Sequence, residues 1–366
     1  MTVSSAPLAV AIVGCGMIGL THARAIARHS GLAIAALVDP VPGAASVLGE
    51  RVVTELGLAA PTEFLNLPEA LAAGPIDLVV ICTPSGLHVQ LAEEALAAGA
   101  HVVIEKPLDV SMPRARRLLE LSREAEGRGL VVSVISQHRF DPSSVAVARA
   151  AHSGEFGRIV SGVALIDWWR SQDYYDSGTW RGTWELDGGG AVMNQGVHTV
   201  DLLVWFLGRP VEIFAQTALL AHERIEVEDV AVATVRFESG ALGIIHATTA
   251  AYPGLSARVQ VHGDRGSAII DGDLLLFFGD SAVPPVTPAA DAFVTGHVRQ
   301  YENIVEAIRL GRRPGVTVED AFTSLAVVRA IYLSATLGRP VGFDEVTSGA
   351  LDAIVTVTGG AGRIGA

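Results

Sequence analysis

LAVAIVGCGMIG, residues 8–19, is the stretch that decides the fold. An apolar run, Leu8–Val13, leads directly into three glycines spaced G-x-G-x-x-G, and a helical pattern follows them. A buried strand that passes through this spacing into a helix is typical of a dinucleotide-binding βαβ unit. The stretch therefore predicts the first strand of a parallel sheet and, directly after it, a phosphate-binding loop.

Each glycine of this loop has a separate expected role. Gly14 permits the tight turn, Gly16 lets the backbone approach a pyrophosphate, and Gly19 lets the helix pack closely. Met17 and Ile18 lie at the helix start, where free backbone N–H groups bind phosphate. The loop thus predicts a dinucleotide cofactor.

Asp39 ends the second apolar run, 20 residues beyond Gly19. A carboxylate at this position accepts hydrogen bonds from the adenosine ribose hydroxyls and repels a 2′-phosphate. No arginine or lysine follows in residues 40–43. We therefore expect NAD rather than NADP, and the alternative is that Asp39 is only a turn residue before Pro40.

Short apolar runs alternate with helical patterns over the first 137 residues, as in successive βαβ units. The predicted strands are Leu8–Val13, Ala33–Val38, Leu78–Ile81, His101–Ile104 and Val131–Ile135, and the predicted helices are Ile18–Arg28, Ala44–Leu56, Gly86–Ala98 and Ser111–Arg128. Strands that are apolar on successive residues suit a parallel sheet covered on both faces. The fold class is therefore α/β, with an N-terminal Rossmann dinucleotide-binding domain over residues 1–137.

The pattern changes after residue 137, where a short helix, Ser143–His152, precedes pairs of apolar runs joined by turns of Gly, Asp and Ser. The paired runs are Val230–Phe237 with Ala241–Thr248 and Ala257–His262 with Ser267–Ile270, and a further run starts at Leu274. Such turns join antiparallel strands. Two helices follow, His297–Leu310 and Glu319–Leu337. Residues 138–345 therefore predict an α+β domain with an open, mostly antiparallel sheet, for substrate binding and oligomerisation.

We expect residues 346–366 to form a tail that belongs to neither of the two predicted domains. Its last part, TGGAGRIG at residues 358–365, looks like the phosphate loop of a short-chain dehydrogenase, but one residue follows it and no helix completes a site. We expect the tail to be non-functional, and a fusion remnant would explain the likeness.

The net charge of −13 argues against nucleic acid as a partner, because DNA binding needs a concentrated basic face. The N-terminal residues lack the charged start of a signal peptide, and no run approaches the roughly 20 apolar residues that span a membrane. Cys15 and Cys82 follow no metal-binding spacing, so no metal site is expected. We expect a cytoplasmic protein without a membrane partner.

Three motifs, in this order and at these separations, resemble the Gfo/Idh/MocA family of glucose–fructose oxidoreductases and inositol dehydrogenases. They are the glycine loop, EKPL at residues 105–108 and GGGAVMNQGVHTVD at residues 188–201. The resemblance covers about residues 8–343. It implies a Rossmann domain followed by an open antiparallel sheet domain, in agreement with the periodicity.

The resemblance also implies cofactor contacts beyond the glycine loop. These are Thr83, Pro84, His88, Glu105, Lys106, Gln137, Trp180 and Arg181. Thr83 and Pro84 match the strand end that borders the nicotinamide, and Glu105 would contact the nicotinamide ribose or order Lys106. His88 lies near a helix start, so a surface or capping role is the alternative to a cofactor contact.

Lys106 and His198 are the catalytic residues that the resemblance implies. An ammonium group near the reacting carbon stabilises negative charge on its oxygen, and a partly desolvated lysine can transfer a proton. A histidine can remove the proton of an alcohol at neutral pH. From spacing alone, the alternatives are an exposed lysine paired with Glu105 and a core histidine satisfied by Asp201.

Asn194, four residues before His198, departs from the inositol dehydrogenase branch, which has an aspartate there. An amide can bind a substrate hydroxyl or orient the ring, but it cannot stabilise a charged imidazole as a carboxylate would. We expect Asn194, His198 and Asp201 to share one helix face. Which of Lys106 and His198 takes the proton stays open. The Asn-Gln-Gly-x-His pattern looks like branches that oxidise a pyranose ring hydroxyl.

The segments DWWRSQDYY, residues 167–175, and WRGTW, residues 180–184, hold four of the five tryptophans. Aromatic faces stack on the C–H surface of sugars, and charged or amide groups bond their hydroxyls. The expected substrate contacts are Lys106, Arg170, Tyr174, Trp180, Asn194 and His198. The alternative is an aromatic cluster that packs an interface between domains or subunits.

Together these inferences predict an NAD-dependent dehydrogenase that oxidises a secondary hydroxyl of a sugar, anhydrosugar, nucleotide sugar or inositol to a ketone. Rival activities within the family are a glycosidase that uses bound NAD transiently and a non-catalytic sugar- or NAD-sensing regulator. A third rival activity is that of an NADP-dependent reductase, which Asp39 disfavours. The exposed face of the second domain's sheet, with the family resemblance, predicts a homodimer or homotetramer.

Overall fold

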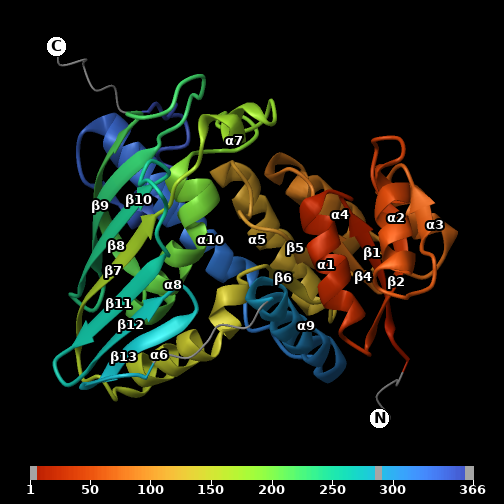
Figure 1. The fold of residues 1–366 in the computed structure, drawn as a ribbon, viewed down its shortest axis with the longest axis horizontal. Coiled ribbons are helices and arrows are strands. Elements are labelled where there is room, and N and C mark those ends of the chain that lie inside the picture. The colour runs from red at the N-terminus through yellow and green to blue at the C-terminus, as the bar shows by residue number, and fades with distance from the viewer. Residues whose placement is uncertain (1–5, 285–290, 359–366) are drawn as a thin grey trace. The chain divides into compact units, whose positions relative to one another are not determined.

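A computed structural model of the chain describes residues 6–284 and 291–358. Contacts between residues divide the chain into two compact units (Figure 1). The first takes the described residues of Met1–Asp109, Arg114–Gln137 and Ala290–Ala321, and the second takes those of Val110–Pro113, His138–Ala289 and Phe322–Ala366. The glycine-rich part of the predicted tail, residues 359–366, lies outside the described residues.

The first unit is a Rossmann fold. Over the described residues its sheet has six parallel strands in the order β3-β2-β1-β4-β5-β6, so the chain reverses its winding between β1 and β4. The strands are β1 (Leu8–Val13), β2 (Leu32–Val38), β3 (Thr62–Phe64), β4 (Leu78–Ile81), β5 (His101–Ile104) and β6 (Val132–Val134). The helices are α1 (Met17–Ala27), α2 (Ala44–Thr54), α3 (Leu67–Ala73), α4 (His88–Ala97) and α5 (Met112–Gly127). The predicted parallel Rossmann sheet is confirmed.

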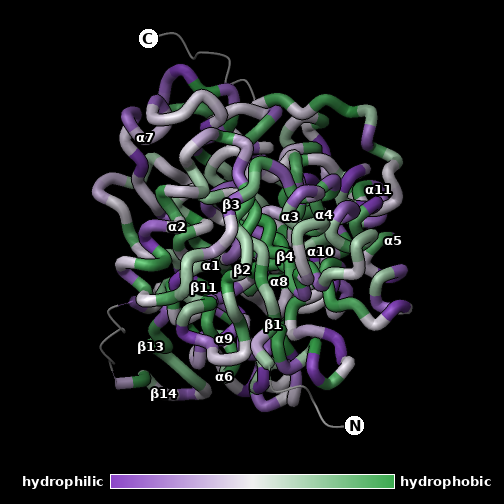
Figure 2. Tube along the Cα trace, turned by 90° about the vertical axis from the view of Figure 1, so that its right-hand side faces the viewer, coloured by the Kyte–Doolittle hydropathy of each residue, from purple (hydrophilic) through white to green (hydrophobic). Residues whose placement is uncertain are grey.

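The parallel strands are apolar on successive residues because both of their faces are covered. Val10 and Ile12 of β1 and Val80 of β4 are fully buried in one core with Leu48 of α2. Figure 2 shows β1 and β4 as hydrophobic segments, in green. Two elements of this unit were not predicted, β3 and α3. β3 has only three residues, none of them fully buried, so it carries no apolar run.

Helix α9 (Ala292–Leu310) packs in the first unit, whereas the division predicted from the sequence places its residues in the second domain. Its Tyr301, Ile304 and Val305 are buried in the same core as Val10 of β1. The helix lies against α1. The apolar face of α9 therefore completes a core that begins almost 300 residues earlier in the chain.

The second unit is built on a mixed sheet whose described strands follow the order β14-β13-β12-β11-β7-β10-β9-β8-β15. Only the pair β7 and β10 is parallel there, which confirms the mostly antiparallel sheet. The strands are β7 (Ile159–Asp167), β8 (Pro210–Ala218), β9 (Val230–Phe237), β10 (Leu242–Thr248), β11 (Arg258–Gly263), β12 (Ser267–Asp271), β13 (Leu274–Gly279), β14 (Ser281–Ala282) and β15 (Val341–Gly342). β9 with β10 and β11 with β12 are the two predicted hairpins.

Helices cover one face of this sheet, as Figure 1 shows for α8 and α6. The α-helices among the described residues of this unit are α6 (Pro142–Ser153), α7 (Gln172–Asp176), α8 (Val197–Leu207), α10 (Val318–Leu337) and α11 (Phe343–Thr347), not all of which lie on the sheet. By length and composition α10 could cross a membrane, but 61% of its most apolar window is buried inside the protein. Leu325, Val328 and Ile331 are among its fully or almost fully buried residues, so α10 is a core helix.

Gly19 and Gly16 form a matched pair for testing how α1 packs on the glycine loop. A Cβ at Gly19 would lie 2.2 Å from the carbonyl oxygen of Gly14, whereas a Cβ at Gly16 would meet no atom within 4 Å. Gly19→Ala should therefore lower the free energy of unfolding by about 1–3 kcal/mol, because the backbone must shift. Gly16→Ala should leave it nearly unchanged. Urea unfolding of both variants checks this, and an equal loss in both would contradict it.

Candidate functional site

The parallel sheet brings the predicted cofactor residues to one edge of the first unit. Each lies just beyond the carboxyl end of a strand: Gly14 after β1, Asp39 after β2, Thr83 after β4, Glu105 after β5 and Gln137 after β6. Carboxyl ends of parallel strands meet at one edge, and doubly wound sheets bind ligands there, at the point where the winding reverses. The reversal lies between β1 and β4.

The glycine loop packs closely against backbone atoms of its neighbours. Gly14 has a φ of +97°, and a Cβ there would lie 2.7 Å from the carbonyl oxygen of Cys82, so a side chain is excluded on both grounds. Gly16 is the N-cap residue of α1 and has no side chain that could accept a hydrogen bond from the helix start. The first N–H groups of α1 are therefore open to a ligand, beside an open space at Gly16.

Asp39 braces this loop. Its Oδ2 accepts a hydrogen bond from the backbone N of Cys15 at 2.8 Å, and its Oδ1 accepts one from Val41 at 2.9 Å. Burial, followed by the charge of Asp39, raises the pKa of the Cys15 thiol to about 12. Asp39 thus stabilises both the turn that follows it and the glycine loop, and its contact with the ribose stays a prediction.

Thr83 and Gln137 each present a buried oxygen that lacks a hydrogen-bond partner within the described part of the chain. These atoms are Oγ1 of Thr83 and Oε1 of Gln137. The Gln137 side chain is 1% exposed. A buried polar atom without a partner is costly, so both atoms fit a ligand that supplies the missing group. With the open glycine loop, they make this edge suited to a dinucleotide.

His88 is the first residue of α4 and is fully buried, so the surface alternative is wrong. Its Nε2 lies 3.0 Å from the carbonyl oxygen of Thr83, and its Nδ1 lies 3.3 Å from that of Leu108. Burial lowers the pKa of His88, which favours the neutral ring with one donor nitrogen. We interpret His88 as a residue that positions the strand end at Thr83, and a direct contact with the cofactor stays a prediction.

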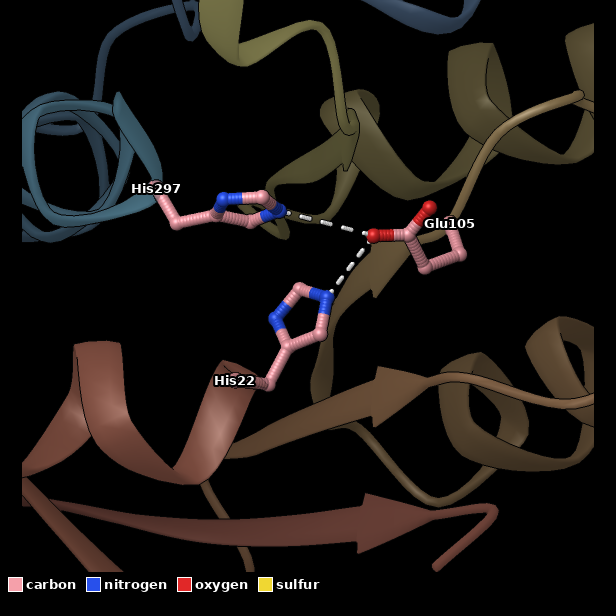
Figure 3. A group of neighbouring side chains, drawn as sticks. All are labelled: His22, Glu105 and His297. Carbon is pink, nitrogen blue, oxygen red and sulfur yellow. Dashed lines mark hydrogen bonds and ion pairs between the residues drawn. The ribbon is translucent and has the colours of Figure 1, made fainter. Parts of the chain in front are cut away.

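Glu105 lies in a buried cluster that joins α1, β5 and α9 (Figure 3). Its Oε1 is 2.9 Å from Nε2 of His22 and 3.7 Å from Nε2 of His297, and its Oε2 accepts a hydrogen bond from the backbone N of Lys106 at 2.9 Å. Burial opposes the charge of Glu105, but the hydrogen bond from His22 and the nearby His297 outweigh it and hold the carboxyl pKa well below its usual value. The carboxylate thereby fixes the backbone at Lys106.

The outer nitrogens of both histidines are also held. Nδ1 of His22 lies 2.6 Å from the hydroxyl of Tyr301, and Nδ1 of His297 lies 2.8 Å from the carbonyl oxygen of Phe293. Burial lowers the pKa of His22, so its ring is neutral and can accept from Tyr301 while it donates to Glu105. The sequence analysis missed His22, His297 and Tyr301.

By spacing alone this cluster could also hold a metal ion, since its three ligand atoms lie within 4.8 Å of one another. Figure 3, however, shows both ring nitrogens directed at one oxygen of Glu105. The contact from Nε2 of His22, at 2.9 Å, is a direct hydrogen bond to this oxygen, so that ring nitrogen already has a partner. In the second unit His138, Asp141 and Asp273 meet the same spacing, and there His138 forms an ion pair with Asp141 at 2.8 Å.

The predicted catalytic residues of the second unit lie in and directly after a π-helical segment, Ala191–Gly196. Asn194 is in this segment, and its Nδ2 donates to Oδ1 of the buried Asp187 at 2.5 Å. His198 is half-buried in the first turn of α8 and stacks edge-on against His138 at 5.4 Å. Because a π-helix has more residues per turn, the α-helical spacing assumed for Asn194 and His198 does not hold.

Asp201 is part of the core of the second unit. Its two carboxylate oxygens each accept a hydrogen bond from Arg139 at 2.7 Å, and Ser324 donates to one of them at 2.7 Å. Both side chains of the ion pair are 5% exposed. This bidentate pair ties the 3₁₀ turn at Arg139 to α8 and α10.

Glu228, which the sequence analysis missed, anchors the π-helical segment. Its carboxylate accepts hydrogen bonds at 3.0 Å from the backbone N of Gly190, the backbone N of Val192 and the hydroxyl of Tyr332. A Cβ at Gly190 would lie 1.8 Å from the carbonyl oxygen of Glu228. Burial raises the pKa of Glu228 to about 7, although these hydrogen bonds lower it. An acidic residue between Val227 and Val230 was the only signal in the sequence.

The predicted substrate residues of the aromatic segment form one network in the second unit. Arg181 donates to the hydroxyl of Tyr174 at 2.8 Å, Gln195 donates to the same hydroxyl at 3.1 Å, and Arg170 donates to Gln195 at 2.8 Å. The guanidinium of Arg181 also lies 4.4 Å from the ring of Trp180, which is 36% exposed. Since Gln195 belongs to the π-helical segment, the aromatic residues are bonded to the segment that carries Asn194.

Comparison with known families assigns both parts of the chain. Residues 8–134 match the "Oxidoreductase family, NAD-binding Rossmann fold", and residues 145–269 match the "GFO/IDH/MocA C-terminal domain". The matches cover the parallel sheet and most of the second unit's sheet.

Among individual proteins, the chain is 27% identical over 336 residues to an inositol 2-dehydrogenase from Rhizobium meliloti (strain 1021), over 88% of this chain and 95% of that protein. It is 34% identical to the WlbA dehydrogenase from Bordetella pertussis, solved in complex with NADH and UDP-GlcNAcA, with a TM-score of 0.79 over 92% of this chain and 98% of that one. A levoglucosan dehydrogenase, in complex with NADH and levoglucosan, shares the fold at 20% identity, with a TM-score of 0.79 over 92% of this chain and 99% of that one.

Glu228 gives the stability of the protein a pH dependence of defined sign. Its carboxyl has a pKa of about 7 in the folded state against an ordinary value of 4.5, so the folded state binds more protons between these values. The free energy of unfolding should therefore fall by up to about 3 kcal/mol as the pH rises from 5 to 8. Glu228→Gln should flatten this slope, even if it lowers the stability at every pH. Urea unfolding across this range checks it, and parallel slopes for the two proteins would contradict it.

Proposed function

Because the chain belongs to the GFO/IDH/MocA oxidoreductase family and is an NAD-binding oxidoreductase, we propose that it oxidises a secondary hydroxyl of a sugar or sugar-like polyol to a ketone. The first unit holds NAD at the carboxyl edge of its sheet, and the second supplies groups that bind the substrate. The carbohydrate ligands of the solved relatives and the inositol dehydrogenase homologue support this substrate class. When bound, NAD accepts the hydride.

One observation carries the proposal: Lys106 is the only lysine among 366 residues, and the other 25 members of the Lys and Arg total are arginines. Arginine stays protonated in proteins, whereas a lysine can give up its proton when it is partly desolvated. A chain that uses arginine at every other basic position and lysine here needs a compact ammonium that can transfer a proton. Glu105 positions this residue through the backbone N of Lys106.

His198 and Asn194 supply the corresponding groups of the second unit in this proposal. A half-buried imidazole at the start of α8 can accept or return the hydroxyl proton. The Asn194 amide donates through Nδ2 to Asp187, and the oxygen of an amide can accept a hydrogen bond from a sugar hydroxyl. Lys106 stabilises the negative charge that grows on the substrate oxygen as its proton leaves.

Substitution of the two proposed catalytic residues should reduce turnover by about two orders of magnitude or more, with NAD affinity preserved. The assay follows NADH at 340 nm with inositols, free aldoses, anhydrosugars and nucleotide sugars for Lys106→Ala, Lys106→Arg and His198→Ala. Lys106→Arg keeps the charge and removes the transferable proton, so it separates the two roles of the lysine.

A matched control is Arg149→Gln, which removes a cation from the exposed side of α6 and should leave turnover unchanged. Near-normal rates in both alanine variants would refute the catalytic assignment. If the wild-type protein binds NAD but forms no NADH with any sugar of the panel, the dehydrogenase activity is refuted. That result would favour a glycosidase that uses bound NAD transiently, or a regulator.

Asp39 should set the preference for NAD. Asp39→Asn removes the negative charge and keeps an oxygen that can accept from Cys15 or Val41, whereas Asp39→Ala removes both. Both variants should weaken NAD and improve the ratio of NADP to NAD affinity by about tenfold or more, because the 2′-phosphate is no longer repelled. Calorimetric titration of both cofactors checks this. An unchanged ratio in both variants would show that Asp39 only braces the loop.

We further propose a homodimer or homotetramer that forms through the outer face of the second unit's sheet. Phe214, Val232, Leu242 and Ile244 lie on this face in β8, β9 and β10, and each is at least 41% exposed. An exposed apolar patch on an antiparallel sheet marks an association surface. Light scattering that gives the monomer mass of 38.2 kDa would refute this. A cytoplasmic location remains part of the proposal, in keeping with the free thiols of Cys15 and Cys82.

A further inference from the structure

Two arginines of the aromatic segment carry charges that no acid of the described chain balances. Arg170 donates to the carbonyl oxygen of Trp169 at 3.2 Å and to the amide oxygen of Gln195, and Arg181 donates to the hydroxyl of Tyr174. All three acceptors are neutral, and neither guanidinium has an ion pair within the described residues. The chain does not lack acids, since it holds 39 Asp and Glu against 26 Lys and Arg.

The two guanidinium groups lie against the same aromatic ring, and both arginines are partly buried. The guanidinium carbons of Arg170 and Arg181 lie 5.2 and 4.3 Å from the centroid of the same ring, that of Tyr174. The Nε atoms of both arginines are buried and have no hydrogen-bond partner in the described structure. Arginine cannot shed its proton, so a bound anion would lower both the repulsion between the two cations and the cost of their partial burial.

Other arginines of this unit show what a purely structural role looks like. Arg139 forms an ion pair with Asp201, and Arg224 forms one with Asp176 at 2.7 Å. Each of these cations is therefore neutralised by a carboxylate of the protein itself. Stacking on Trp180 and Tyr174 orients Arg181 without neutralising it. Arg170 and Arg181 are therefore oriented cations whose counter-charge is not part of the described chain.

The pair is also tied to the segment of the proposed chemistry. Gln195 accepts from Arg170 and donates to Tyr174, and it directly follows Asn194 in the π-helical segment. A group bound at the arginines is therefore linked, through one glutamine, to the backbone that carries Asn194 and leads into His198. Within the second unit this is the arrangement of a specificity subsite.

We propose that Arg170 and Arg181 bind an anionic group of the sugar substrate, a carboxylate or a phosphate. The planar guanidinium fork matches both groups in shape and charge. The substrate class is thereby narrowed from sugars in general to acidic sugars or sugar phosphates, including nucleotide-linked ones. This inference rests on the proposed function, because it assigns the arginines to the substrate of that reaction.

The test measures binding separately from turnover. Trp168 and Trp180 lie within 5.1 Å of the two guanidinium groups, so tryptophan fluorescence reports on this segment. The NAD-bound protein is titrated with glucose, glucuronate, UDP-glucose and UDP-glucuronate. Probes with the recognised anion should bind about tenfold or more tightly than glucose, and Arg170→Gln and Arg181→Gln should each remove most of that advantage.

The four probes separate the two sources of negative charge. If the arginine variants weaken glucuronate and UDP-glucuronate only, the recognised group is the carboxylate. If they weaken UDP-glucose and UDP-glucuronate alike, it is the phosphate. Either result supports the subsite. Unchanged affinity of every anionic probe in the variants, an equal loss for glucose, or no binding of any anionic probe would overturn it.

Three controls guard against a folding defect or a general charge effect. Arg149→Gln removes the same charge from the exposed side of α6 and should leave every affinity unchanged. Arg170→Lys and Arg181→Lys keep the charge and lose the fork, so they should restore part of the lost affinity. In the wild-type protein, inorganic phosphate should compete with the anionic probes and not with glucose, and failure of this competition also counts against the subsite.

Different experimental results would refute the anion subsite and the proposed dehydrogenase activity. If the affinities follow the arginines while no sugar yields NADH, the anion subsite stands and the dehydrogenase is refuted. If a neutral sugar yields NADH equally fast in the wild-type protein and in both glutamine variants, the dehydrogenase stands and the anion subsite is refuted.

Discussion

The close approach of α1 to the glycine loop is the constraint on which the first unit depends. Residue 19 lies so close to the carbonyl oxygen of Gly14 that only a glycine fits. A side chain at residue 14 would in turn collide with the carbonyl group of Cys82. The loop is thereby trapped between the start of α1 and the end of β4, and Asp39 fixes it from β2. Because α1 and β4 meet the loop through backbone atoms, the N–H groups at the start of α1 keep one direction, as the binding of an anion requires.

The first unit could be predicted well from the sequence, because each strand of a parallel sheet has a pattern that can be recognised over a few consecutive residues. Strands buried on both faces are apolar on successive residues, and the residues just after them mark the functional edge. The same reasoning could not place α9, because its partners lie far away in the chain: His22 and Tyr301, bonded at 2.6 Å, are 279 residues apart. Sequence patterns of short range therefore could not predict the cluster around Glu105, which also fixes the backbone of Lys106.

In the second unit the hairpins could be predicted from their turns, whereas the segment between Gly190 and His198 could not be predicted in detail. Its apolar spacing favours an α-helix, and the π-helical turn arises from contacts made at a distance. Glu228 accepts hydrogen bonds from Gly190 and Val192, and its carbonyl oxygen occupies the space of a side chain at Gly190. A buried acid 36 residues further along the chain therefore decides how Asn194 is presented.

Unsatisfied polar atoms give an independent argument about where the ligands bind. Five buried side-chain atoms of the described residues have no partner, and four of them belong to residues named from the sequence alone: Thr83, Gln137, Arg170 and Arg181. Each such atom costs about 1–3 kcal/mol, which a purely structural position would avoid with an apolar side chain. In the first unit the two atoms are a hydroxyl oxygen, which can donate or accept, and an amide oxygen, which accepts, as suits the hydroxyls and amide of a dinucleotide. In the second unit both are donors of cationic groups beside the π-helical segment, so a partner with acceptor atoms and negative charge would offset their cost best.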